Sequence, residues 1–255
     1  MTNSLSVLNT ELSSCRKCAR LVEWREEVAR VKRKAYKDQE YWGKPVPGFG
    51  DPQARVFVVG LAPGAHGSNR TGRQFTGDAS GGFLYPALYR AGFASQPEST
   101  QRNDGLILTD MYIAAVCRCA PPGNKPLPEE MGNCQPYLER ELALIQPKVI
   151  VVLGRIAFES VLRISRRWTV DRGPLLSTAA PSQGVHGLPS TVVFSHGAVY
   201  SLKTHLPNPA ILNMPSWLIC SYHPSQQNTQ TGKLTVEMFD SVWRKVKELL
   251  NPIVL

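Results

Sequence analysis

The stretch RVFVVGLAPGAHGSNRTGRQFTGD, residues 55–78, decides the fold. It begins with an apolar run of strand length, Val56–Val59, and continues as a glycine-rich loop. A buried strand that leads into such a loop is typical of α/β proteins, where the loop meets a phosphate or a base. This loop has no Lys-Ser or Lys-Thr pair, and its glycines have the wrong spacing for a dinucleotide fingerprint. The familiar nucleotide motifs therefore do not say what it binds.

Similar apolar runs alternate with amphipathic segments along the rest of the chain. We expect helices over residues 5–34, 81–93, 128–147, 155–164 and 234–250, and further strands within 112–116, 148–154, 191–195 and 216–223. Residues 164–190, rich in Arg, Ser, Pro and Gly, are expected to be an irregular insertion. Strands that alternate with helices predict βαβ units, and thus an α/β fold with a mainly parallel sheet covered on both faces. No clear boundary divides the chain, so we expect one domain over residues 1–255.

The composition favours a polyanionic partner. The chain has 255 residues, and 29 Lys and Arg against 20 Asp and Glu give a net charge of +9. Such an excess is typical of proteins that bind nucleic acid, because Lys and Arg replace the counterions of phosphates. No apolar run reaches the roughly 20 residues of a membrane helix, and the N-terminus has no pattern of a secretory signal. We therefore expect a cytoplasmic protein without disulfides or membrane contact.

Three loops should form the ligand site, because ligands of open α/β sheets gather at the carboxyl ends of the strands. These loops are Gly60–Asp78, Cys117–Pro128 and the segment HPSQQNTQTGK at 223–233.

The cysteines indicate a metal site. Cys15 and Cys18 form a C-x2-C pair, and Cys119 and Cys134 are two more distant thiols. Four thiolates suit either structural zinc or an iron–sulfur cluster, and the spacing does not choose between them. Cys117 competes with Cys119, because both point to the same side of an extended chain. Cys220 lies in an apolar strand and is expected in the core.

Several motifs in order closely resemble the family 5, or type-b, uracil-DNA glycosylases. They are CRKC, YWGKPVPGFGD, GLAPGAHGSNRTGRQFTGD, RCAPPGNKPLPEE and HPSQQNTQTGKLT, and they extend from about Cys15 to Leu234. The resemblance implies a three-layer α/β/α sandwich around a short, mainly parallel sheet. It also implies removal of uracil and other deaminated bases, such as hypoxanthine, from DNA. A [4Fe–4S] cluster would be held by Cys15, Cys18, Cys119 and Cys134.

With this resemblance, the glycine-rich loop is expected to hold a base flipped out of DNA, where it is stacked and recognised by its edge. Phe75 matches the aromatic residue of the family that stacks on the base; without the resemblance it would be interpreted as a core residue. Gly64 and Ala65 would let the base and its sugar approach the backbone.

Two positions depart from related families. Where other uracil glycosylases have a water-positioning acid, this chain has Leu61, as in family 5. Asp78 is the leading substitute, as a catalytic carboxylate or as no more than a helix N-cap. Where family 4 has an Asn that reads uracil, this chain has Ala114 and Ala115, which fits a broader base preference. Asn124 is a candidate polar contact, or an ordinary turn residue.

The remaining candidates lie around the same loops. His223 could donate a hydrogen bond to the departing base anion. Gln226, Gln227 and Asn228 are suited to fill the gap left by the flipped base. Arg70, Arg73 and Lys233 are expected to contact phosphates.

We therefore expect a monomeric glycosylase that acts on duplex or single-stranded DNA and works through electrostatic preorganisation, without lyase chemistry. One alternative is a metal-stapled DNA-binding protein without activity. The other, a relative that bonds covalently to DNA, is disfavoured because SNRTGRQF contains no basic loop with a His.

Overall fold

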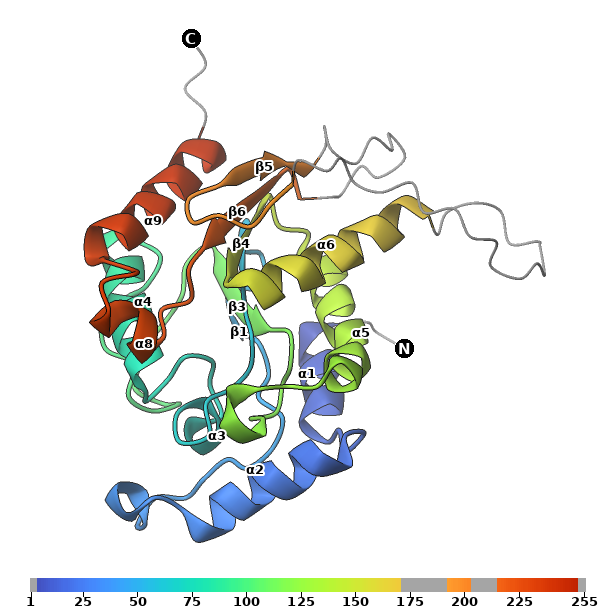
Figure 1. The fold of residues 1–255 in the computed structure, drawn as a ribbon, viewed down its shortest axis with the longest axis vertical. Helices are drawn as coiled ribbons and strands as arrows, with labels where there is room; N and C mark the ends of the chain where they lie inside the picture. The colour runs from blue at the N-terminus through green and yellow to red at the C-terminus, as the bar shows by residue number, and fades with distance from the viewer. Residues whose placement is uncertain (1–3, 171–191, 203–214, 252–255) are drawn as a thin grey trace, which may run out of the picture.

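The computed structural model describes residues 4–170, 192–202 and 215–251 (Figure 1). A six-stranded sheet in the order β1-β3-β2-β4-β6-β5 forms its centre. The inner strands β3, β2, β4 and β6 are parallel, whereas β1 and β5 pair antiparallel at the two edges. The strands are β1 Phe49–Gly50, β2 Val56–Gly60, β3 Met111–Ala115, β4 Val149–Leu153, β5 Val199–Ser201 and β6 Trp217–Ser221.

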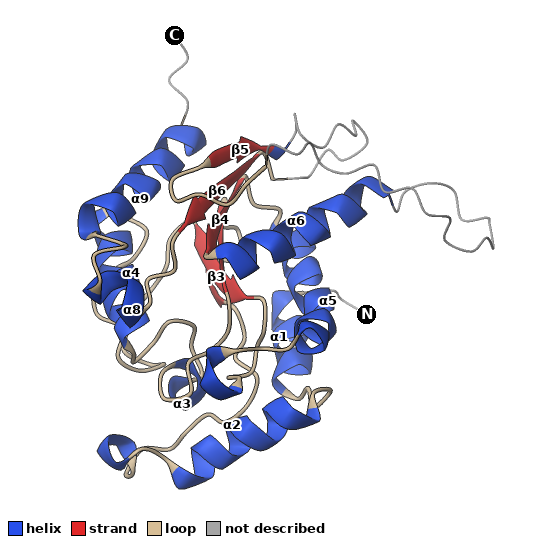
Figure 2. Ribbon diagram, in the orientation of Figure 1, coloured by secondary structure: helices blue, strands red, loops and turns tan. Residues whose placement is uncertain are grey.

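Helices cover both faces of this sheet (Figure 2). One face packs against α4 (Ala79–Arg90) and α9 (Val236–Leu250), and the other against α5 (Pro128–Ile145) and α6 (Arg155–Val170). Successive residues of one strand belong to opposite cores: Val56 and Val58 face α4 and α9, whereas Phe57 and Val59 face the other layer. This alternation follows from the period of two in a strand. The predicted α/β/α sandwich is confirmed.

The N-terminal segment differs from the single helix predicted over residues 5–34. It forms α1 (Leu5–Ser13), which packs on α5, and α2 (Ala19–Val31), with the C-x2-C pair in the break between them. Ser4 caps α1 through its side chain. In Figure 1, α2 lies across the end of the molecule below α3.

Two other expectations needed correction. The helix predicted to end at residue 164 continues to Val170, so the irregular insertion cannot begin before residue 171; residues 171–191 lie outside the described part. Residues 192–195, predicted as a strand, have no regular structure, and the edge strand is β5 instead. Cys220 lies in the core of the α5–α6 face, as predicted.

The short elements were not predicted, because two to five residues carry no visible periodicity. They include β1, the 3-10 turns η1 (Lys34–Tyr36) and η2 (Pro122–Asn124), α3 (Ser68–Thr71) and α8 (Gln226–Gln230). Three of them, α3, η2 and α8, lie within the predicted ligand loops. Within the described ranges, no helix is long and apolar enough to span a membrane.

Candidate active site

The three predicted ligand loops converge on one open cleft of about 860 Å³. The cleft lies where β2, β3 and β6 end, because parallel pairing brings their carboxyl ends to the same edge of the sheet. Its lining comes from the glycine-rich loop, η2, the start of α8 and the segment after α2. The polar and aromatic residues that line it include Arg33, Tyr36, His66, Gln74, Phe75, Asp78, Asn124, His223, Gln226 and Gln227.

Phe75 is held in an unusual backbone conformation at the wall of this cleft. Its φ is 51°, in the left-handed region that non-glycine residues rarely adopt. Two glycines make the position accessible. A Cβ on Gly60 would lie 2.8 Å from Phe75 Cζ, and a Cβ on Gly81 would lie 1.9 Å from the Phe75 carbonyl oxygen. The ring is 8% exposed, with its centroid 5.8 Å from that of His223. The backbone of Phe75 is therefore strained, and its aromatic ring is held in place at the cleft.

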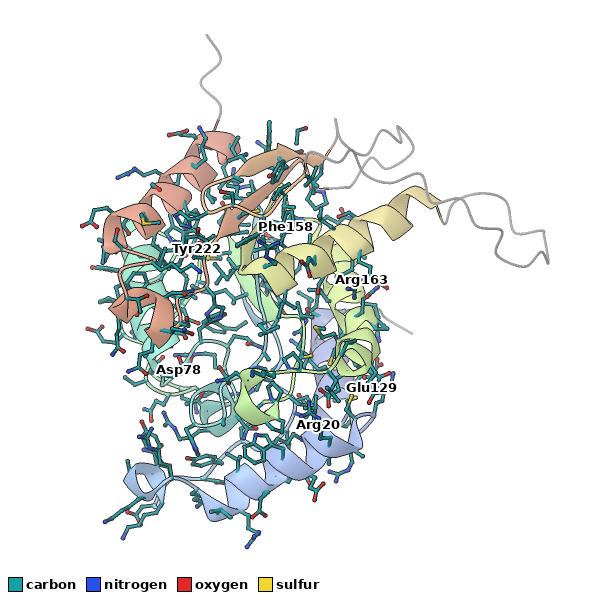
Figure 3. The ribbon with its side chains drawn as sticks, viewed as in Figure 1. Arg20, Asp78, Glu129, Phe158, Arg163 and Tyr222 are labelled. Carbon is teal, nitrogen blue, oxygen red and sulfur yellow. The ribbon has the colours of Figure 1, made fainter. Side chains whose placement is uncertain are left out.

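Asp78 begins α4 and also lines the cleft; Figure 3 labels it beside this helix start. Its Oδ1 accepts a hydrogen bond from the Gly81 N–H at 3.0 Å, so the predicted cap exists. Its Oδ2 lies above the loop backbone, where a Cβ on Gly67 would approach to 2.0 Å and one on Gly64 to 3.0 Å. Burial raises the pKa of Asp78, although the hydrogen bonds from the helix start oppose the shift. One side chain thus caps the helix with one oxygen and presents the other within the cleft loop.

His223 follows β6 and enters the cleft beside Phe75. Burial lowers its pKa to about 4, so the imidazole is neutral at neutral pH. Its backbone is braced by Asn228, whose Nδ2 donates to the His223 carbonyl oxygen at 2.8 Å. Asn228 is therefore occupied in positioning this segment, and only Gln226 and Gln227 of the predicted trio line the cleft.

The remaining predicted contacts take different positions. Gly64 and Ala65 line the cleft, as does exposed Asn124. Asn124 has a φ of 58° and belongs to the η2 turn, so it is a turn residue whose side chain also borders the cleft. Lys233 is exposed, with its Nζ 5.1 Å from the centroid of the Tyr222 ring.

The structure corrects the prediction that Arg73 contacts a phosphate. The side chain is 3% exposed and forms a buried ion pair with Asp104, in which Nη2 and Oδ2 are 2.6 Å apart. The guanidinium also donates hydrogen bonds to Thr76 Oγ1, to Ser99 Oγ and to the carbonyl oxygen of Arg102. No exposed donor is left for DNA.

Arg70 needs the same correction. It is 7% exposed and donates to the backbone carbonyl oxygens of His66 and Gly77, at 2.7 and 2.9 Å. Its remaining guanidinium nitrogen donates to Gln39 Oε1 at 2.6 Å, and the guanidinium stacks 4.1 Å from the Tyr36 ring centroid. Both arginines fasten the loop internally.

The cleft residues that sequence reasoning missed include Arg33, Tyr36, His66 and Gln74. His66 Nδ1 lies 3.1 Å from the Tyr41 hydroxyl oxygen. His66 stands inside the quoted GAHG motif, so its position in the loop was an available signal. Arg33 and Tyr36 follow α2 and reach the cleft only through tertiary packing.

The four predicted metal ligands, Cys15, Cys18, Cys119 and Cys134, line one small internal cavity between α2 and α5. Cys117 does not line it. Within the described ranges, no three His, Cys, Asp or Glu side chains stand close enough to surround a single metal ion.

A buried arginine lies beside this cavity. Arg25 is 2% exposed; its Nη1 donates to Cys119 Sγ at 2.9 Å and its Nη2 to the Cys15 carbonyl oxygen at 3.2 Å. Its Nε has no hydrogen-bond partner. A buried cation needs a counter-charge, and a neutral thiol supplies none. The guanidinium also forms a long ion pair with exposed Glu26, in which Nη2 and Oε1 are 3.8 Å apart. The donor set, together with a buried guanidinium whose Nε is unpaired, fits an anionic, thiolate-bound group.

Comparison with known proteins agrees with this geometry. The family model of the uracil DNA glycosylase superfamily matches residues 47–247. A type-5 uracil-DNA glycosylase of Thermus thermophilus is 49% identical over 93% of this chain and 94% of its own length. Proteins of the same description from Mycobacterium leprae and Pyrobaculum aerophilum are 46% and 40% identical, over 96% and 92% of this chain and 96% and 88% of their own lengths. The chain belongs to the uracil-DNA glycosylase superfamily and, within it, to the type-5 uracil-DNA glycosylases.

Proposed function

We propose that this protein is a monofunctional DNA-repair glycosylase that flips uracil out of DNA and hydrolyses its N-glycosidic bond, leaving an abasic site. The observation that carries the proposal is the convergence of Phe75, Asp78 and His223 on one cleft at the carboxyl edge of the sheet. A flipped base needs a stacking surface, a polar group at its edge and an electrostatic field at the sugar, and these side chains offer all three.

In this mechanism the bond between C1′ and the base breaks first, and the electron pair leaves with the base. Phe75 stacks on the base. Neutral His223 carries one ring N–H, which can donate a hydrogen bond to the developing base anion. The proton stays on the ring. The fixed position of both rings means that little reorganisation is needed as charge develops.

Asp78 acts on the other fragment. Its carboxylate stabilises the positive charge that develops on the sugar and orients the water that adds to C1′. The water leaves its hydroxyl on the sugar, and its proton neutralises the departed base. Asp78 is the only carboxylate within residues 60–78, so this loop offers no other acid for the role.

We extend the proposed substrates to other deaminated bases, including hypoxanthine. β3 presents Ala114 and Ala115 toward its carboxyl end, and both are buried. Small side chains there supply no amide that would demand the edge of uracil. Without that amide, a purine such as hypoxanthine is not rejected for lacking the edge of uracil.

We also propose a [4Fe–4S] cluster bound by Cys15, Cys18, Cys119 and Cys134. A four-iron cluster is larger than one ion, so its thiolates stand farther apart than the ligands of a single zinc. When bound, it joins the N-terminal segment to α5 as a structural cross-link. Arg25 compensates its negative charge.

The metal proposal is tested on anaerobically purified protein. Iron–sulfur clusters absorb broadly in the visible, whereas zinc does not. We expect brown protein that contains iron and sulfide, with both lost in Cys18→Ser. Colourless, folded and active protein that contains only zinc would reject the cluster.

The proposed setting is a monomer acting in the cytoplasm, associated with the nucleoid while bound to damaged DNA. The support is the site itself, because one chain supplies every side chain invoked above.

The glycosylase proposal is tested with duplex oligonucleotides that carry uracil, hypoxanthine or no lesion. Free base and abasic sites are measured under single-turnover conditions, with Asp78→Asn as the matched control. We expect release from the first two substrates alone. DNA binding without release of any base would reject the proposal and favour a binding protein without glycosylase activity.

A further inference from the structure

The exposed cations at the rim of the cleft are not those of the glycine-rich loop. They belong to residues 32–37, here called the basic segment, which contains Lys32, Arg33, Lys34 and Lys37. It begins where α2 ends: Lys32 has a φ of 57°, which turns the chain sharply away from the helix axis. The 3-10 turn η1 then makes the segment compact.

The basic segment reaches the same cleft as the proposed catalytic groups. Arg33 and Tyr36 line the cleft together with Asp78 and His223. Figure 1 shows α2 and the following turn at the end of the molecule where α3 lies. Because Arg33 and Tyr36 form part of the lining, a strand of DNA whose base enters the cleft comes close to the basic segment.

The cations of the basic segment are free to act on a partner. Arg33, Lys34 and Lys37 are exposed, and none of them forms an ion pair in the part of the chain that the structure describes. Lys32 donates to the Lys37 carbonyl oxygen at 3.3 Å. Two carboxylates, Asp38 and Glu40, follow directly, so residues 32–40 still carry four cations against two anions.

Arg70 holds the basic segment in place. Its guanidinium stacks on Tyr36 and donates to Gln39, while the same side chain is anchored to the loop backbone at His66 and Gly77. A second link runs through Tyr41, whose hydroxyl contacts both the Arg33 N–H, at 3.4 Å, and His66. The exposed cations therefore stand on a support that is tied to the base-binding loop.

We propose that the basic segment binds the phosphate backbone of the DNA strand that enters the cleft, and that Arg70 is its positioning residue. The proposal rests on the proposed function in that the cleft receives a base from DNA. Phosphates would order the exposed Lys and Arg side chains and release counterions. Arg70 itself does not contact the phosphates; it acts indirectly, by fixing the basic segment against the loop that holds the base.

The test compares Lys34→Ala, Lys37→Ala and the double variant with wild-type protein. Fluorescence anisotropy measures binding to an undamaged duplex and to a uracil duplex over a range of salt concentrations. Each lost phosphate contact should lower the slope of log K against log salt by about 1, and should weaken binding to both duplexes equally. Because both lysines are exposed, thermal unfolding should not change.

Arg244→Ala is the matched control, since it removes one exposed cation from α9, away from the cleft. Its salt slope should equal that of the wild type. An unchanged slope in the double lysine variant would overturn the proposal, as would an equal decrease in Arg244→Ala. Binding to the undamaged duplex requires no base release, so failure of the glycosylase proposal is detected separately, in wild-type protein that binds DNA and releases no uracil.

Discussion

The glycine-rich loop and the basic segment border the same cleft, yet they use their cations in opposite ways. The loop turns Arg70 and Arg73 inward, onto its own carbonyl groups and onto Asp104. The basic segment turns Arg33, Lys34 and Lys37 toward solvent. A net charge of +9 says that a polyanion is a plausible partner, but it does not say which cations the partner meets.

The difference has a physical cause. An irregular loop leaves backbone carbonyl groups without partners inside the protein, and each of them needs a donor. Arginine supplies several donors in a fixed fork and so can hold such a loop together. Lysine is a strongly hydrated point charge, and it remains at the surface. The loop thus uses its arginines for structure, whereas two of the three exposed cations of the basic segment are lysines.

The largest effect is expected for Arg73→Ala, which tests whether the arginines of the glycine-rich loop serve its stability. The change leaves Asp104 buried without its partner, at a cost of about 3 to 5 kcal/mol in the free energy of unfolding. Urea denaturation measures this loss, and the double variant Arg73→Ala with Asp104→Ala should recover part of it. If Arg73→Ala had wild-type stability and a reduced salt slope for DNA binding, Arg73 would instead contact a DNA phosphate.

The second effect concerns Asp78, the carboxylate that the loop presents to the cleft. Asp78→Asn keeps the cap and removes the charge, so base release should slow by about 100-fold, the order found when one stabilising group is removed. DNA affinity and thermal stability should stay near normal, since Asn caps about as well as Asp. If Asp78→Asn releases base at the wild-type rate while Asp78→Ala loses stability, the residue is a cap alone.

Arg70→Gln addresses the link between the two regions. It removes the stacking on Tyr36 and leaves carbonyl groups of the loop unpaired, which should cost about 2 kcal/mol of stability. DNA binding should weaken as well, because the basic segment loses its support. Lys34→Ala is the contrast, with weaker binding and unchanged stability. An Arg70→Gln protein with lower stability and wild-type DNA binding would show that the basic segment does not depend on Arg70.

The smallest effect on base release is expected for the titration of His223, which lies in the cleft beside Phe75. Its pKa, lowered by burial to about 4, keeps the ring neutral from pH 6 to 8, so its own titration should not alter base release there. The unfolded ring binds a proton near pH 6.5, so stability should fall as the pH drops from about 6.5 to 4. NMR titration of the ring, assigned with His223→Asn, measures the pKa directly; a midpoint near 6.5 would place His223 in solvent.

Much of the fold follows from local patterns in the sequence. The apolar runs at β2 and β4 and the amphipathic pattern of α9 are visible because burial imposes a period of two or 3.6 on the residues themselves. Each motif loop is contiguous in the sequence, and the rule that ligands of open α/β sheets gather at the carboxyl ends of the strands predicted that these loops meet. Phe75, Asp78 and His223 could therefore be named from the sequence as candidates of one site. The structure places all three on one cleft.

Other features were decided only by tertiary structure. β1 has two residues and exists because β3 offers it partners, and the strand predicted at 191–195 has no regular structure at 192–195. The conformation of Phe75 depends on Gly60 and Gly81, which are distant enough in the chain that no local rule connects them. Whether a cation faces a phosphate or a carbonyl group is set by what packs around it. The sequence therefore determined which groups were available for chemistry, whereas the packing of distant segments decided which of them face the cleft.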